Sequence, residues 1–223
     1  MMSAKTKYPR YQDYVIKDGD LIGEFEAMYR DFDDPWHQVA HAARASDKAV
    51  GIALLERLRQ AFGVGRVVEI GCGLGQYTNR IAEAGFDAVG IDVSAHAIAG
   101  ARERFPGIQF AAGDIADFDG LAALTPDVVV LSEITWYVLG ALPGFLENLR
   151  RRLPDAFLLH MLVTYPPGVQ SLGADTFTDL EGILRYFDMT YLEWGEACAA
   201  DGHRRTYFLG TWQEERLVQW SAA

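Results

Sequence analysis

The stretch RVVEIGCGLGQYT, residues 66–78, decides the fold of this chain. It opens with an apolar run that is bounded by glycine and too short for a helix, which predicts a buried parallel strand. Gly71, Gly73 and Gly75 then form a turn, and the helical spacing that begins near Gln76 predicts that this turn opens a helix. Such glycines leave bare backbone for a ligand, and a helix N-terminus suits a negatively charged group. The stretch therefore predicts a ligand-binding turn between a strand and a helix.

Two acidic residues indicate which ligand this turn binds. Glu69 precedes glycines spaced G-x-G-x-G, where the dinucleotide fingerprint is G-x-G-x-x-G. A pyrophosphate favours a helix end without carboxylates, whereas a ligand with an ammonium or sulfonium group favours an acid there. The next apolar run, AVGIDVS, contains Asp92, whose carboxylate can accept hydrogen bonds from both hydroxyls of a ribose. The pattern points away from a dinucleotide.

Four segments between residues 66 and 139 together resemble the class I S-adenosylmethionine-dependent methyltransferases. They are the glycine stretch, AVGIDVS, GDIADF and PDVVVLSEITWYVL. Within the last of them, EITWYVL is similar to the corresponding segment of nodulation-factor N-methyltransferases. The resemblance implies S-adenosylmethionine as the cofactor. The residues that it places around the cofactor are Glu69, Gly71, Cys72, Gly73, Gly75, Asp92, Val93, Asp114, Ile115 and Ser132.

The family also assigns these residues to parts of the cofactor. The acid and the glycines of the first segment surround the methionine part, Asp92 holds the ribose, and Asp114 and Ile115 match the adenine position. Cys72 has a second explanation, because a small side chain suits the turn. With Cys198 as the other cysteine, the chain has neither a disulfide framework nor a cysteine metal cluster.

The resemblance and the order of elements predict the same fold class. Apolar runs alternate with helical patterns, as in an α/β doubly wound sheet. The family fold is a seven-stranded, mostly parallel sheet with one reversed C-terminal strand and an N-terminal helical cap. We expect strands at residues 108–113, 126–131 and 156–163, and a helix with Ser94 as its N-cap.

The last third of the chain has antiparallel character. Residues 189–195 and 205–212 are aromatic runs joined through an Asp-Gly pair, which predicts a hairpin. For the preceding helix we expect Thr178 as N-cap and Glu181 as its partner in a capping box. The final residues are expected to form a short helix or a loose tail.

Residues 1–47 are predicted to form an arm and a helical cap, and residues 48–223 the methyltransferase domain. Apolar residues at helical spacing predict an amphipathic helix over residues 20–32. A proline then ends regular structure and presents Trp36 and His37. Trp36 either closes the pocket or packs the cap against the core, and His37 either meets the substrate or is solvated.

Composition narrows the class of partner. The chain has 223 residues, 50% of them hydrophobic, which suits one domain with an ample core. With 20 basic against 31 acidic side chains, its formal charge is −11, which opposes phosphate backbones. We therefore expect a small-molecule acceptor and no nucleic acid. Because we find neither a long apolar run nor a leader pattern, we expect a cytoplasmic protein without membrane contact, monomeric or homodimeric.

Candidate acceptor-side residues follow the predicted fourth and fifth strands and the cap. Glu133 comes directly after the most apolar run, where an acid requires a partner or a ligand. Core packing is the alternative explanation for the two aromatic residues after it, and a hydrogen-bonded core position is the alternative for His160. The predicted catalytic residues are Glu133, His37 and Tyr137, and the predicted substrate contacts are Trp36, Trp136, Tyr165 and His160.

The predicted function is methyl transfer from S-adenosylmethionine to a hydroxyl or amine of a small polar molecule, such as a sugar or a secondary metabolite. One alternative is a non-catalytic module that binds S-adenosylmethionine or serves as a scaffold. Another is a NAD(P)-dependent oxidoreductase, which the glycine spacing and Glu69 disfavour. The sequence shows no cluster of Asp and Asn ligands for Mg²⁺, so we predict a reaction that needs no metal.

Overall fold

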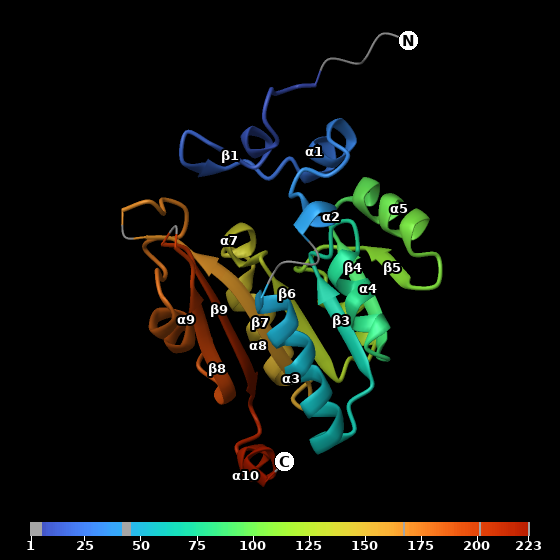
Figure 1. Cartoon of the computed structure of the whole chain (residues 1–223), viewed down its shortest axis with the longest axis vertical. Coiled ribbons are helices and arrows are strands. Elements are labelled where there is room, and N and C mark those ends of the chain that lie inside the picture. The colour runs from blue at the N-terminus through green and yellow to red at the C-terminus, as the bar shows by residue number, and fades with distance from the viewer. Residues whose placement is uncertain (1–5, 42–45, 167, 201, 223) are drawn as a thin grey trace.

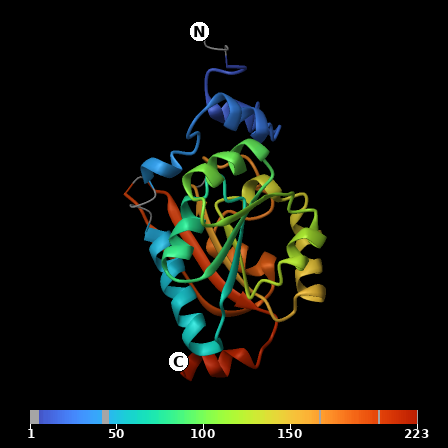
Figure 2. The same ribbon diagram turned by 90° about the vertical axis from the view of Figure 1, so that its right-hand side faces the viewer.

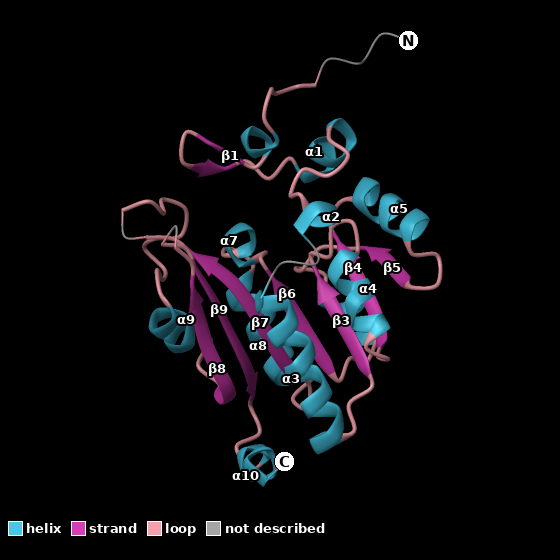
Figure 3. Ribbon diagram, in the orientation of Figure 1, coloured by secondary structure: helices cyan, strands magenta, loops and turns pink. Residues whose placement is uncertain are grey.

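The computed structural model describes residues 6–41, 46–166, 168–200 and 202–222 (Figure 1). A seven-stranded sheet with the order β5-β4-β3-β6-β7-β9-β8 forms its centre, and helices cover both faces (Figure 3). The strands are β3 (Arg66–Ile70), β4 (Asp87–Asp92), β5 (Gln109–Ala112), β6 (Val128–Ser132), β7 (Phe157–Thr164), β8 (Thr190–Cys198) and β9 (Arg204–Thr211).

The direction of the strands confirms the predicted fold class. The first five strands of the sheet are mutually parallel, from β5 at the edge to β7. β9 runs antiparallel to both of its neighbours, β7 and β8, and is the one reversed strand. Every predicted strand of the sheet is present, with its ends shifted by a few residues at most.

Two apolar layers hold the helices on the sheet. Successive side chains of a strand point to opposite faces, so Val67 and Val68 belong to different layers. The layer with Val67 holds α3 (Ser46–Phe62), α4 (Gln76–Glu83) and α10 (Arg216–Ala222). The layer with Val68 holds α6 (Phe118–Ala123), α7 (Thr135–Val138), α8 (Leu142–Arg152) and α9 (Leu180–Phe187). α5 (Ala95–Arg104) packs through Ile98 on Phe110 of β5.

Residues 6–41 form a cap beyond the C-terminal edge of the parallel strands, as Figure 2 shows from the side. The cap contains a 3₁₀ turn (Tyr11–Tyr14), a hairpin of β1 (Ile16–Lys17) and β2 (Asp20–Leu21), and the helices α1 (Phe25–Asp31) and α2 (Gln38–His41). A cluster of buried side chains, among them Tyr14, Met28 and Tyr29, joins it to α5 and the glycine turn through Ala97 and Leu74.

The expected helix over residues 20–32 is wrong in its first part. Asp18 and Gly19 both adopt positive φ, which builds a tight turn between β1 and β2. Gly23 has φ of 62°, and α1 begins only at Phe25. The turn chemistry of the Asp-Gly pair therefore overrides the helical spacing of the apolar residues before Phe25.

Helix caps follow the sequence in one case and depart from it in another. Ser94 caps α5 as predicted, because its hydroxyl accepts a hydrogen bond from Ala97 N at 3.1 Å. α9 is capped by Asp179 rather than Thr178, with Gly182 N donating to the carboxylate at 2.8 Å. Glu181 pairs with Arg185 one turn further on, so the expected capping box does not form.

No helix within the described ranges combines the length and the apolar character that crossing a membrane requires.

Candidate functional site

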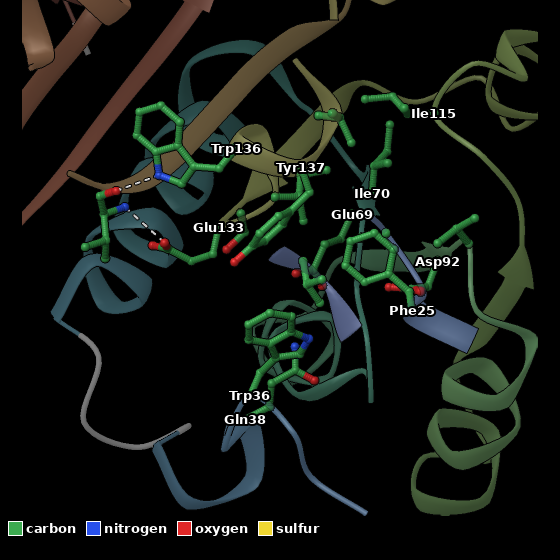
Figure 4. Close-up of a pocket in the computed structure, with 18 of the residues that line it drawn as sticks. Phe25, Trp36, Gln38, Glu69, Ile70, Asp92, Ile115, Glu133, Trp136 and Tyr137 are labelled. Carbon is green, nitrogen blue, oxygen red and sulfur yellow. Dashed lines mark hydrogen bonds between the residues drawn. The ribbon is translucent and has the colours of Figure 1, made fainter. Parts of the chain in front are cut away.

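A cavity of about 990 Å³ lies where the cap meets the C-terminal edge of the sheet (Figure 4). Doubly wound sheets bind ligands at this edge, where the strand order reverses next to β3. Pockets for single small molecules measure roughly 300–1,000 Å³. The cavity is therefore large enough for a nucleoside cofactor and a second small molecule.

Glu69 lies at the end of β3 on the cavity wall and is only 3% exposed. Its carboxylate accepts a hydrogen bond from the Thr78 hydroxyl at 2.5 Å. Burial raises the pKa of this carboxyl to about 7, against the lowering effects of Thr78 and of the Lys48 ammonium group. A buried acid in this state favours a ligand that brings positive charge.

Asp92 ends β4, the neighbouring strand, and also lines the cavity. Gly73 N donates to one carboxylate oxygen at 2.8 Å, and Ser94 N donates to the other at 2.9 Å. Burial raises the pKa of Asp92, while these two donors lower it. Each oxygen can accept a further hydrogen bond, so the fixed carboxylate suits the two adjacent hydroxyls of a ribose.

The three glycines of the turn have different roles. Gly71 has φ of 73° and lines the cavity. A Cβ at Gly73 would lie 2.5 Å from Oε1 of Gln38, and one at Gly75 would lie 2.6 Å from the ring of Phe110. A Cβ at Gly71 would overlap the side chain of Ile134, so all three glycines allow close packing, and Gly71 also lines the cavity.

Cys72 lies on the other side of this turn. Its side chain is buried in the cluster of Ile98, Ala101 and Phe110, and it is not among the residues that line the cavity. The explanation that a small side chain suits the turn fits this position. Only the backbone of Cys72 could make the predicted contact with the cofactor.

The remaining predicted cofactor residues lie on the cavity wall. Val93 is half exposed, and Ile115 faces Ile70 and the cap residue Phe25 in Figure 4. The carboxylate of Asp114 accepts a hydrogen bond from Ala116 N at 2.8 Å, which stabilises the turn in this loop. Apolar walls beside Asp92 suit a flat base attached to the ribose. The predicted cofactor residues that line the cavity are Glu69, Gly71, Asp92, Val93, Asp114, Ile115 and Ser132.

Several cavity residues were not singled out from the sequence. Phe25, Tyr29 and Gln38 come from the cap; the helical spacing of Phe25 and Tyr29 indicated packing alone, and Gln38 gave no signal. Lys48 begins the described side chains of α3; it hydrogen-bonds to Ser132 and lies 4.9 Å from the centre of the Tyr77 ring. A lone lysine at the start of a helix gave no signal that it would reach the end of β6.

Glu133 follows β6 and has φ of 63°, a conformation that non-glycine residues rarely adopt. Its carboxylate lines the cavity and accepts a hydrogen bond from Val163 N at 3.0 Å (Figure 4). Tyr137 lies one helical turn further on, also on the wall. Burial raises the pKa of its phenol, and the charges of Tyr165 and Glu133 raise it further. Glu133 and Tyr137 thus meet at one end of the cavity.

Trp36 and His37 approach this end from the cap. The Trp36 ring centre lies 5.5 Å from that of Tyr137 and 5.2 Å from that of Tyr11. His37 has φ of 52°, is exposed, and has its ring centre 5.8 Å from that of Tyr11. Both residues line the cavity. The structure therefore brings both cap candidates together with the candidates from the sheet.

The structure separates the other three substrate candidates. Tyr165 lines the cavity and is 36% exposed. Trp136 touches the cavity but is largely a core residue, since its indole N–H donates to Val163 O at 2.9 Å and its ring packs on Phe177.

His160 lies away from the cavity, so the structure contradicts its predicted substrate contact. It is fully buried in the middle of β7, with Nε2 2.8 Å from the Thr135 hydroxyl and its ring stacked on Phe208. Burial lowers its pKa to about 3. The core alternative fits this position, because only the last residues of a parallel strand reach the ligand edge.

Across the described residues, no three His, Cys, Asp or Glu side chains come together in a way that could hold a metal ion.

Comparison with known proteins agrees with this geometry. Residues 67–155 match the model of the methyltransferase domain family. A S-adenosylmethionine-dependent methyltransferase from Clostridium acetobutylicum has a similar structure, with 12% identity, 82% of this chain and 98% of that chain covered, and a TM-score of 0.60.

Two further solved structures are similar. For the N-methyltransferase NodS from Bradyrhizobium japonicum, solved with S-adenosyl-L-homocysteine, identity is 21%, coverage 80% of this chain and 93% of that chain, and the TM-score 0.57. TehB from Haemophilus influenzae is 17% identical, with 72% of this chain and 62% of that chain covered and a TM-score of 0.54. This chain therefore spans about three fifths of TehB. Among curated proteins none matches the chain.

Residues 67–155 thus match the methyltransferase domain family, and the strand order and the acids at the sheet edge fit a class I S-adenosylmethionine-dependent methyltransferase. The similar solved structures share this fold, and S-adenosyl-L-homocysteine is bound in NodS. The match favours a methyltransferase over the oxidoreductase alternative.

Proposed function

We propose that the enzyme transfers the methyl group of S-adenosylmethionine to a hydroxyl or amine of a small polar molecule. The observation that carries this proposal is the division of one cavity into two ends. Glu69, Asp92 and Ile115 line the end that suits the cofactor, and Glu133 and Tyr137 line the other. When bound, the cofactor supplies a methyl group on a positively charged sulfur.

In this proposal Asp92 holds the ribose and Glu69 lies near the positively charged part of the cofactor. Both carboxylates are fixed by hydrogen bonds from neighbouring groups, so little reorganisation is needed on binding. Lys48 limits the local excess of negative charge, since its ammonium group lowers the pKa of Glu69.

The acceptor end favours a small molecule. The cap covers it with Tyr11, Trp36 and His37, which leaves a space enclosed by side chains from both parts of the chain. Methyl transfer is a displacement in line with the leaving sulfur, so the enzyme has to orient the acceptor and accept its proton. Glu133 and His37 are the proposed proton acceptors, and Tyr137 orients the acceptor.

A panel of small alcohols, phenols and amines tests this proposal, with release of S-adenosylhomocysteine as the readout. We expect turnover with at least one class, and we expect Tyr137→Leu to lower kcat/KM for that acceptor roughly tenfold or more, with little change in affinity for S-adenosylhomocysteine. Tyr191→Leu, which changes a tyrosine in the strand β8 outside the cavity, is the control. Turnover only with oligonucleotides or folded proteins would contradict the proposal.

A further inference from the structure

The acceptor end of the cavity combines a carboxylate with aromatic rings. Tyr11, Trp36, Tyr137 and Tyr165 all line it. The rings of Tyr11 and Trp36 are 5.2 Å apart between centres, and those of Trp36 and Tyr137 are 5.5 Å apart. Aromatic faces attract a cation placed within about 6 Å of the ring centre, and more strongly where water is excluded.

Glu133 acts electrostatically on two of these tyrosines. Apart from burial, the charge of Glu133 is among the causes that raise the pKa of both Tyr137 and Tyr165, and Tyr11 contributes to both. Electrostatic effects of this kind require short distances. The raised pKa keeps the phenols of Tyr137 and Tyr165 uncharged beside the carboxylate of Glu133.

The backbone also holds Glu133 in an unusual state. Its φ of 63° is costly for a residue with a Cβ, and its carboxylate is oriented by Val163 N. Residues held in this way cluster at functional sites, where the surroundings fix the position of a side chain. The geometry directs the carboxylate of Glu133 to the cavity wall rather than into solvent.

We propose that the acceptor is a protonated amine, bound with its ammonium group against Glu133 and beside the rings of Trp36 and Tyr137. This inference rests on the function proposed above and names its substrate class. The formal charge of −11 on the chain favours approach of a cationic substrate over an anionic one.

Glu133 would also prepare the amine for reaction. The ammonium nitrogen gives one proton to the carboxylate, and the lone pair that remains forms the new N–CH₃ bond. The C–S bond of the sulfonium breaks with its electron pair on sulfur, so the products are a methylated ammonium ion, a neutral thioether and protonated Glu133. Total charge is conserved, and no further reactant is needed.

Other charged groups face the same end of the cavity. Arg205 and His203 come from β9 and the hairpin before it, and the ring of His203 lies 5.2 Å from that of Tyr165. Arg205 is the register partner of Val163. If these groups recognised the acceptor, the acceptor would carry a carboxylate or phosphate. An anionic probe would then bind more tightly than a cationic one.

Three probes of one size but different charge separate these outcomes: benzylammonium, benzyl alcohol and benzoate. Their affinities are measured by titration calorimetry on protein saturated with S-adenosylhomocysteine. We expect benzylammonium to bind at least roughly tenfold more tightly than the alcohol, and benzoate most weakly. Tightest binding of benzoate, equal affinities, or no binding by benzylammonium would each overturn the proposal.

Two variants and a control test the residues. Glu133→Gln retains an oxygen that accepts the hydrogen bond from Val163 N. It should weaken the binding of benzylammonium at least roughly tenfold and change the affinity for benzyl alcohol by no more than about threefold. Tyr137→Leu should also act mainly on benzylammonium. Glu147→Gln removes an exposed acid of α8 and should change none of the three affinities. A loss of affinity that is the same for all probes would place Glu133 outside the amine site.

The same experiment separates this inference from the proposed function. If protein that binds S-adenosylhomocysteine methylates only hydroxyl acceptors, the amine inference is wrong, but the proposed methyl transfer to a small molecule is retained. Binding of S-adenosylhomocysteine without turnover of any small amine, alcohol or phenol would contradict both.

Discussion

Glu69 and Asp92 stand on adjacent parallel strands, and both are nearly fully buried. Burial accounts for most of the raised pKa of Glu69, and the charge of Asp92 adds to it. Two buried carboxylates close together disfavour each other's ionisation, and a positively charged ligand favours the ionised form of both. At the scale of single residues, we therefore expect cofactor binding to be coupled to the protonation of Glu69.

Glu69 should make the stability of the protein depend on pH. Its pKa rises from 4.5 to about 7 on folding, so the native state keeps a proton that the unfolded state loses as pH increases between these values. This stabilising contribution is complete below pH 4.5 and is lost by pH 7 and above, a total of about 3 kcal/mol. Urea denaturation at pH 5 and pH 8 measures it.

Glu69→Gln serves as the comparison, because it keeps an acceptor for the Thr78 hydroxyl but cannot titrate. All other titrating groups are shared, so the difference between the two proteins isolates this residue. Wild type should lose more stability than the variant from pH 5 to pH 8. Parallel losses in both proteins would show that Glu69 is ionised throughout.

At the scale of elements, the first turns of α1 and α2 hold the cap on the methyltransferase fold. Glu26 of α1 accepts hydrogen bonds from the Ser94 hydroxyl at 2.7 Å and from His96 N at 3.1 Å, at the start of α5. Gln38 of α2 accepts one from Leu74 N at 2.8 Å in the glycine turn. Both contacts join the cap to the turns that surround the cofactor site.

Glu26→Ala should loosen the cap. Losing these bonds costs about 1 kcal/mol, which corresponds to a roughly fivefold larger open population. Limited tryptic proteolysis of residues 6–41 should then be faster by about the same factor, since cleavage follows the open state. S-adenosylhomocysteine should slow it in wild type, because Phe25 and Gln38 line the cavity.

The matched control is Glu24→Ala, at the N-cap of the same helix. Glu24 pairs with Lys7, so its ion pair lies entirely within the cap and does not reach α5. Its removal should leave the cleavage rate of the docked cap near the wild-type value. Equal acceleration by both substitutions would mean that Glu26 does not hold the cap in place.

The whole molecule gathers its ligand site from distant parts of the chain. Residues from the cap, from β3 and β4, and from the loops after β6 and β7 share one cavity. Binding there should consequently stabilise the entire fold. At a concentration of one hundred times Kd, S-adenosylhomocysteine should add about 2.7 kcal/mol, which raises Tm by roughly 5–10 °C in a chain of this length.

A thermal-shift series with S-adenosylhomocysteine, NAD and NADP measures this effect. We expect a shift with the first compound only, and a smaller one in Asp92→Asn at equal concentration, because the ribose loses a carboxylate acceptor. A comparable shift with NAD would argue against the sulfonium-type site. An unchanged shift in Asp92→Asn would remove the proposed role of this residue.

The sequence by itself determined the class of the fold and predicted a place for the cofactor. A short apolar run followed by glycines, then a helical period, specifies a strand, a turn and a helix through local backbone preferences alone. The Ser94 cap is another local effect, and the structure confirms it. Local rules failed where two of them competed, as in residues 20–32 and at Thr178.

Only the tertiary structure decided which side chains reach the cavity. Gly71, Gly73 and Gly75 have the same local pattern, yet they face Ile134, Gln38 and Phe110, which come from three different segments far away in the sequence, and only Gly71 lines the cavity. His160 lies within an apolar strand and Glu133 just after one, but the first is buried inside the sheet and the second lies at its edge, on the cavity wall. Contacts between distant segments depend on how elements pack, and packing is not encoded in the spacing of any one segment.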